Sequence, residues 1–116
     1  MLVEQHGRNL PDDPLRFIQR RVRARQIYWT YHVNMRLRER SIPRRWILDS
    51  VETFEIIEAY SEDKYLPSYL VWAEAGDAKI HVLFAIDVEE NNIRVITAYR
   101  PAPAEWSADK KRRIGQ

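Results

Sequence analysis

The chain of 116 residues is 45% hydrophobic and 31% charged, and it contains no cysteine. This composition is typical of a globular domain and excludes disulfide staples, thiolate metal sites and cysteine nucleophiles. No apolar run approaches the roughly 20 residues of a membrane span, and the N-terminus does not resemble a signal peptide. We therefore expect a cytoplasmic protein with no membrane partner. A single domain should cover residues 1–116, with a flexible arm over 1–12 and a basic tail over 107–116.

Charge is distributed unevenly along the sequence. Residues 1–45 contain eleven arginines and four acidic residues, whereas residues 46–109 carry a net charge of −9. Residues 110–113 are all basic. Fifteen of the 19 basic residues are arginine, whose planar guanidinium group suits phosphate or carboxylate. The pattern indicates either a solvated helical surface or a surface that binds an anionic partner.

Three helices are expected in the first half of the chain. Asp13 before Pro14 predicts a helix start, because aspartate caps the first turn and proline suits the first helical position. Thr30 predicts the cap of a second helix. Between them, residues 26–29 are β-branched and aromatic, which favours an extended connection or an edge strand. The expected helices span residues 14–25, 31–40 and about 43–51.

From residue 54 onward the hydrophobic period changes from helical to alternating. The last two expected strands are apolar on both faces, which is typical of central strands, and a polar loop joins them as a hairpin. The expected fold class is α+β, with N-terminal helices packed on a curved four-stranded antiparallel sheet. The expected strands span residues 54–60, 68–74, 79–87 and 93–100.

The second expected helix carries the sharpest chemical pattern. His32, Arg36 and Arg40 are four residues apart, so they form one ridge on a helix. Two guanidinium groups can hold a phosphate, and an imidazole that titrates near neutrality can move a proton. The alternative is a solvated face on which neighbouring acids pair with the arginines.

Hairpin geometry suggests a second cluster. With a turn centred between Glu90 and Asn91, His81 should lie opposite Tyr99 or Arg100. A histidine, a tyrosine and an arginine would then meet at the end of the sheet away from the turn. The alternative is an ordinary aromatic pair across two strands.

No metal site or cofactor is expected. His6, His32 and His81 are far apart in sequence, and no carboxylates accompany them at the spacing of metal ligands. Glycine-rich phosphate loops and dinucleotide-binding motifs are absent from the sequence.

Several short motifs follow one another in a specific order over about residues 15–113. The motif residues are Thr30, His32, Arg36, Arg40 and Ile42, then Ile80-His81-Val82, Ala85 and Asp87, then Val95-Ile96-Thr97, Tyr99 and Pro101, and finally Trp106 with Arg112-Arg113. Their order resembles the family of domain of unknown function 4258, which comprises small proteins of bacteria and archaea. Ser41 stands where that family usually has glycine.

The resemblance implies a fold similar to the RelE/ParE-like toxins, some of which are metal-independent ribonucleases. On this hypothesis the chain is an endoribonuclease or an RNA-binding protein of a toxin–antitoxin type system. His81 or His32 would act as the base, and Arg36 and Arg40 would stabilise the phosphorane. Tyr99, or the other histidine, would orient or protonate the leaving 5′-oxygen. Further RNA contacts are expected from arginines of the helices and of the C-terminal part. They are Arg16, Arg20, Arg23, Arg38, Arg44, Arg100, Arg112 and Arg113.

The alternative function is that of a non-catalytic module which binds a protein partner or nucleic acid. The charge polarity would suit an acidic antitoxin-like protein or head-to-tail self-association as a homodimer. His32, Arg36 and Arg40 would then hold the structure together. Burial distinguishes the two hypotheses, because a catalytic side chain must reach substrate whereas a structural one is enclosed and hydrogen-bonded.

Overall fold

A computed structural model describes residues 9–115. Residues 1–8 of the expected N-terminal arm therefore lie outside the described part of the chain. The helices are α1 (Pro14–Arg23), α2 (Tyr31–Glu39) and α3 (Arg44–Asp49), and a short 3-10 turn follows at Val51–Thr53. The strands are β1 (Ile27–Trp29), β2 (Glu55–Tyr60), β3 (Ser68–Ala75), β4 (Ala78–Asp87) and β5 (Asn92–Tyr99).

The first two helices begin at the residues that the sequence predicts. The Asp13 carboxylate accepts a hydrogen bond from the Arg16 main-chain N–H at 3.1 Å, and Pro14 occupies the first turn. The Thr30 hydroxyl accepts one from the Val33 main-chain N–H, also at 3.1 Å. Each cap satisfies a main-chain donor that has no partner within its own helix.

The sheet has five strands in the order β1-β5-β4-β3-β2, and it is not closed. Strands β2 to β5 pair antiparallel, as expected, but β1 pairs with β5 in parallel. The prediction of four antiparallel strands was therefore wrong in two respects. It omitted β1 as a fifth strand, and it omitted the parallel pairing of β1 with β5. Residues 26–29 were recognised as extended, but their partner lies more than sixty residues away in sequence. A parallel pairing over that separation leaves no local pattern in the sequence.

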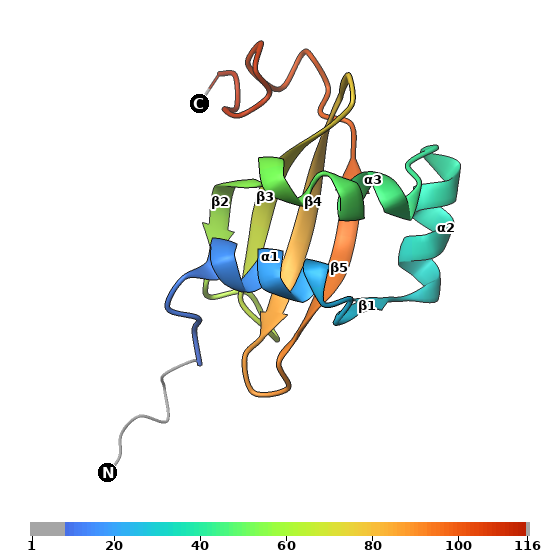
Figure 1. Cartoon of the computed structure of the whole chain (residues 1–116). Coiled ribbons are helices and arrows are strands. Elements are labelled where there is room, and N and C mark those ends of the chain that lie inside the picture. Colours follow the sequence, from blue (N-terminus) through green and yellow to red (C-terminus); the bar gives the residue numbers. More distant parts are fainter. Residues whose placement is uncertain (1–8, 116) are drawn as a thin grey trace.

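The helices α1 and α3 cover one face of the sheet, and α2 stands at the β1 end (Figure 1). On β4, Ile80, Val82 and Phe84 point into the core between the helices and the sheet. Because side chains alternate along a strand, His81 and Leu83 belong to the opposite face. The C-terminal segment, residues 100–115, crosses that opposite face near the turn between β3 and β4.

A bulge in β5 sets the register of the last hairpin. Phe84 pairs with Val95, but Leu83 pairs with Thr97, so Ile96 is an extra residue. Beyond this bulge, His81 pairs with Tyr99, which confirms one of the two predicted partners. Without the extra residue, Tyr99 would point to the other face of the sheet.

Within residues 9–115, no helix is long and apolar enough to cross a membrane.

Candidate functional site

His81 lies fully enclosed at the centre of the sheet face opposite α1 and α3. Its Nε2 is 2.6 Å from the main-chain oxygen of Lys110, and since a carbonyl only accepts, Nε2 carries the proton and donates. Its Nδ1 then accepts from the Tyr99 hydroxyl, a longer contact of 3.4 Å. Burial lowers the pKa of His81, so the ring is neutral at physiological pH. With both nitrogens bonded inside the fold, His81 has the surroundings expected of a structural residue.

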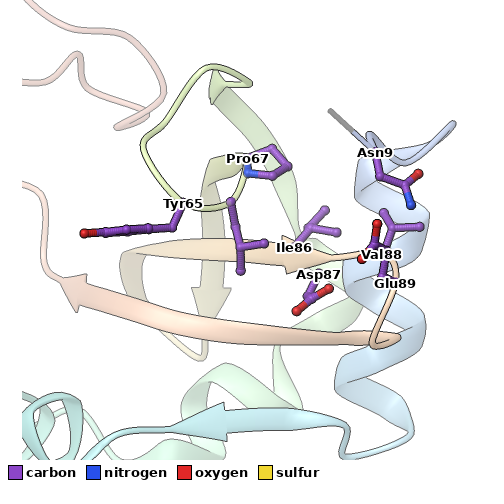
Figure 2. A pocket seen from close by; sticks show the side chains of 8 residues that line it. Asn9, Tyr65, Pro67, Ile86, Asp87, Val88 and Glu89 are labelled. Atoms are coloured by element: carbon purple, nitrogen blue, oxygen red, sulfur yellow. The ribbon is translucent and has the colours of Figure 1, made fainter. Parts of the chain in front are cut away.

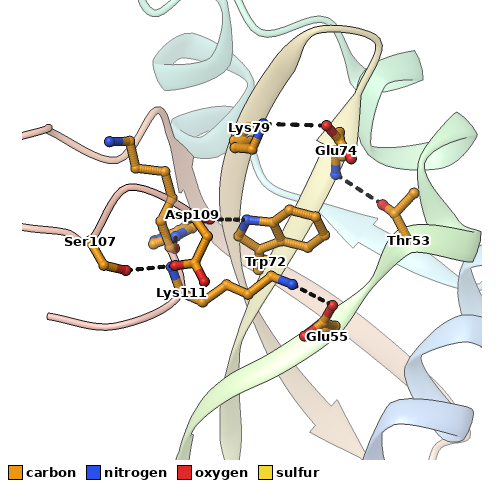
Figure 3. Close-up of polar contacts among 10 residues, drawn as sticks. Thr53, Glu55, Trp72, Glu74, Lys79, Ser107, Asp109 and Lys111 are labelled. Atoms are coloured by element: carbon orange, nitrogen blue, oxygen red, sulfur yellow. Dashed lines mark hydrogen bonds and ion pairs between the residues drawn. The ribbon is translucent and has the colours of Figure 1, made fainter.

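The enclosure of His81 comes from the C-terminal segment. Trp106 is 2% exposed and packs edge-on against the imidazole, with ring centroids 4.4 Å apart. The Trp72 indole N–H donates to the main-chain oxygen of Asp109 at 3.0 Å, and the Lys111 ammonium pairs with Glu55 at 2.8 Å (Figure 3). The segment expected to be a basic tail is thus fastened to β2, β3 and β4.

Arg113 is engaged in the same region. Its Nε and Nη2 donate to the two oxygens of Glu58, at 2.6 and 3.1 Å, and its guanidinium lies 4.6 Å from the centre of the Trp106 ring. Tyr60 donates its hydroxyl to Glu58 as well. The hydrogen bond from Arg113 lowers the pKa of Glu58, and the same bond raises the pKa of Arg113. The prediction that Arg113 contacts RNA is untested, and in this structure a carboxylate compensates its charge.

Along α2, the ridge of His32, Arg36 and Arg40 divides into an exposed part and a bonded part. His32 and Arg36 are exposed, and Arg36 forms only a loose ion pair with Glu39 at 3.4 Å. Arg40 is half-buried, and its Nη1 donates to the Thr97 hydroxyl at 3.1 Å and to the Ala98 main-chain oxygen at 2.8 Å. The pairing of β5 with β1 ends at Val95. Beyond that point, Arg40 supplies the hydrogen-bond donor for a main-chain oxygen on this edge of β5.

The contacts of the ridge and of the His81 cluster are joined through β5. Thr97 pairs with Leu83 and Tyr99 pairs with His81, so Thr97 and Tyr99 share the face opposite the helices. Arg40 thus brings the C-terminal end of α2 to that face. Among the described residues, however, His32 makes no hydrogen bond or ring contact with His81 or Tyr99. The described contacts thus link Arg40 to β5 and His81 to Tyr99, and they link His32 to neither.

Arg100, another predicted RNA contact, also ties α2 to the rest of the fold. It donates to the main-chain oxygens of Arg40 and Ser41, and its guanidinium lies 5.2 Å from the centre of the Trp46 ring. Ser41 itself has a φ of +55°, the left-handed conformation that glycine adopts most easily. The helix therefore ends here in the backbone conformation that glycine favours, although serine occupies the position.

The remaining predicted contacts on the helices are exposed. Among the arginines of residues 9–45, only Arg23 and Arg36 pair with a described carboxylate, and Arg23 does so with Glu52. The other predicted arginines of this region are exposed and form no ion pair with a described carboxylate. They are Arg16, Arg20, Arg38 and Arg44. Arg112 is likewise exposed in the C-terminal segment.

Arg44 has an arrangement that the sequence did not indicate. Its Nε and Nη2 both donate to the side-chain oxygen of Asn34, at 3.1 and 2.8 Å. Its guanidinium also lies 4.6 Å from the centre of the Trp29 ring. Asn34 is ten residues before Arg44 in sequence, and Trp29 belongs to β1, so only the packing of α2 beside α3 brings the three together. An amide oxygen and an aromatic face orient this cation without neutralising it.

A pocket of about 540 Å³ opens beside Arg44, between α2 and α3. Sequence reasoning missed it, because its residues come from two helices and the loop between them. A second pocket of about 240 Å³ lies near the end of β4 and is lined by residues such as Tyr65, Pro67 and Asp87 (Figure 2). None of the predicted site residues lines this second pocket. The part of the chain that the structure covers has no group of three or more His, Asp and Glu side chains placed to hold a metal ion.

Comparison with known proteins gives one match. A family model described as a domain of unknown function, DUF4258, matches residues 29–100. This stretch runs from the end of β1 through β5 and includes the whole α2 ridge, His81 and Tyr99. No curated protein and no solved structure matches the chain.

Proposed function

This chain belongs to the DUF4258 family, and we propose that it is a toxin-like RNA-binding protein that holds RNA on the arginines of its helical layer. One observation carries the proposal. Of the ten arginines in residues 9–45, only two form an ion pair with a described carboxylate, although the sheet and its loops are rich in acidic residues. The acids of β2 pair instead with the C-terminal segment, through Lys111 and Arg113.

The residue types on this surface favour RNA as the anionic partner. Arginine donates two parallel hydrogen bonds to phosphate and stacks on flat rings. Arg44 and Arg100 already lie over Trp29 and Trp46. Exposed arginines interleaved with aromatic rings are typical of surfaces that bind single-stranded nucleic acid. An acidic antitoxin-like protein is the alternative partner.

Salt dependence tests the proposal. A labelled RNA should bind the full chain with an affinity that falls steeply between about 50 and 200 mM salt, because phosphate contacts release counterions. Replacing Arg16 or Arg38 with alanine should lower the slope of log affinity against log salt by about 0.7 each for a single strand. Lys79→Ala is the matched control, because Lys79 pairs with Glu74 in the turn between β3 and β4.

Two results would contradict RNA binding. One is an affinity that does not depend on salt. The other is an equal loss of affinity on replacing Arg38 and Lys79. Binding to an acidic protein with no binding to RNA would favour the alternative module.

The RelE/ParE-like fold is part of the same proposal. What supports it is the layering, with α1 and α3 on one face of a sheet whose strands β2 to β5 are antiparallel. The parallel strand β1 is the feature that any comparison with that fold must accommodate.

Metal-independent cleavage of the bound RNA is a second candidate function, and one observation favours it. His32 is exposed and lies one helical turn from the exposed Arg36. The His32 imidazole would take the proton from a 2′-hydroxyl, whose oxygen would attack the adjacent phosphorus. The bond from phosphorus to the 5′-oxygen would break, and that oxygen would take a proton from water. Arg36 would stabilise the charge of the transition state.

Cleavage is tested with mixed RNA in EDTA. The wild-type chain should produce cyclic phosphate ends, and His32→Gln should abolish them. His81→Gln should leave the activity in place wherever the variant is folded, because His81 is enclosed. If the wild-type chain does not cleave RNA that it binds, the catalytic candidate fails and the binding proposal stands.

A further inference from the structure

We infer that the pocket between α2 and α3 takes one unstacked nucleotide, which makes single-stranded RNA the substrate class of the proposed RNA-binding function. This inference rests on that function, because it places a base and its phosphate at one end of the arginine surface. Four residues carry the argument: Tyr31, Met35, Arg38 and Arg44, all of which line the pocket.

The pocket has an apolar floor and an aromatic wall. Leu37 and Ile42 are buried and close its base. The Tyr31 ring, at the start of α2, is 79% exposed, and Met35 follows one helical turn later with 36% exposure. A flat ring and a flexible thioether side by side offer a stacking surface that the protein does not cover. The volume of about 540 Å³ is within the range of small-ligand pockets.

The polar rim is built for an anion. Arg44 uses its Nε–H and one Nη2–H on Asn34, so three of its five N–H donors remain for a ligand. Asn34 and the Trp29 ring hold the guanidinium in place, and this pre-orientation reduces the entropy lost when a ligand binds. Arg38 lines the same pocket from α2 and pairs with no carboxylate among residues 9–115. Two cations therefore face a space that is lined by no carboxylate of residues 9–115.

Aromatic stacking beside two guanidinium groups matches a nucleotide better than it matches an acidic peptide. A base can lie on Tyr31 while its phosphate receives hydrogen bonds from Arg44. Such a base must leave its stack, which is easy in a single strand and opposed by pairing in a duplex. The pocket therefore predicts a preference for unpaired RNA, which phosphate contacts alone would not produce.

The test compares one RNA in two forms. A labelled oligoribonucleotide of about 12 nucleotides without internal pairing, and the same strand annealed to its complement, are titrated against the full chain by fluorescence anisotropy. The single strand should bind about tenfold or more tightly. Tyr31→Ala should lower its affinity by about five- to 150-fold, the range for one base stacked on an aromatic ring, and should leave duplex affinity unchanged.

Tyr65→Ala is the matched control, because Tyr65 is 80% exposed in the loop between β2 and β3, outside the pocket. It should leave both affinities unchanged. Arg44→Lys keeps the charge but removes the planar fork, and it should weaken single-strand binding more than Lys79→Arg does. Thermal unfolding of each variant confirms that it is folded.

The outcomes separate the two proposals. Equal affinity for the single strand and the duplex, or no difference between Tyr31→Ala and Tyr65→Ala, overturns the nucleotide pocket while salt-dependent RNA binding can persist. Absence of binding to both RNA forms overturns the proposed function and the pocket together. The nucleotide pocket is supported if only the Tyr31 and Arg44 variants lose affinity, and if they lose it only for the single strand.

Discussion

Mild acid should destabilise this protein through the enclosed ring of His81. Burial holds the pKa of His81 below its ordinary value of 6.5. Near pH 6 this imidazole therefore binds more protons in the unfolded chain than in the folded chain. The stabilising contribution of the neutral ring is therefore fully present above pH 6.5. It decreases as the pH falls from 6.5 toward the lowered folded-state pKa.

The size of the effect has an upper limit set by the unfolded chain. A ring that stays neutral in the folded state reduces the free energy of unfolding by at most about 1.4 kcal/mol between about pH 7.5 and 5.5. Glu58 also has a lowered pKa, held down mainly by its hydrogen bond from Arg113, but its contribution is lost only below 4.5. The interval between pH 7.5 and 5.5 therefore lies above the range in which the contribution of Glu58 is lost.

Urea unfolding followed by tryptophan fluorescence measures this dependence at each pH. Wild-type stability should decrease below pH 6.5, whereas His81→Gln should show a nearly flat profile whatever the substitution costs at neutral pH. His32→Gln is the control, because it removes an exposed imidazole and should leave the decrease caused by His81 in place. A flat wild-type profile, or the same slope in His81→Gln and wild type, would refute the assignment of His81 as a neutral, enclosed ring.

Three further substitutions test the parts of the fold around the candidate site. Trp106→Ala should reduce the free energy of unfolding by about 3–5 kcal/mol, because the buried indole covers His81, and amide exchange should show the C-terminal segment released. Arg40→Met should cost about 1–3 kcal/mol in urea unfolding, because the Ala98 main-chain oxygen loses its donor. Ser41→Gly should raise the melting temperature through a gain of up to about 1 kcal/mol, because glycine adopts the positive φ without strain.

Sequence reasoning succeeded where the cause of a structure lies within a few residues. Asp13 and Thr30 cap α1 and α2 because their side chains reach donors only three residues ahead. The strands β2 to β5 follow from alternation, and the short turn between β4 and β5 brought His81 opposite Tyr99 to within one residue. These features depend on local geometry that the sequence specifies directly.

Contacts between distant segments were beyond the same reasoning. The parallel pairing of β1 with β5 joins two strands that are separated in sequence by α2, α3 and three strands. It could be predicted only if the positions of all these elements were already known. The extra residue Ile96 decides which side of β5 Tyr99 faces, yet its side chain gives no local signal of a bulge. Likewise, the sequence predicts that the basic C-terminal segment is a free tail. Only the fold shows that the segment forms ion pairs with Glu55 and Glu58.

The residues of the candidate site also fall into two groups, those that the fold uses and those that stay exposed. Arg40, His81 and Tyr99 are used by the fold, because they satisfy the edge of β5 and hold the C-terminal segment on the sheet. His32 and Arg36 take no comparable part in the packing of residues 9–115, and neither does the exposed ring of Tyr31.

A side chain that packs is explained by stability, whereas one that stays in water on a well-held helix needs another explanation. Because Thr30 fixes the start of α2 and Arg40 fixes its end, the exposed side chains between them are presented in a defined arrangement. A surface that binds an external ligand requires side chains that are held in a defined arrangement and are still exposed to solvent. Functional experiments should therefore begin with α2 and its pocket, and not with the buried histidine.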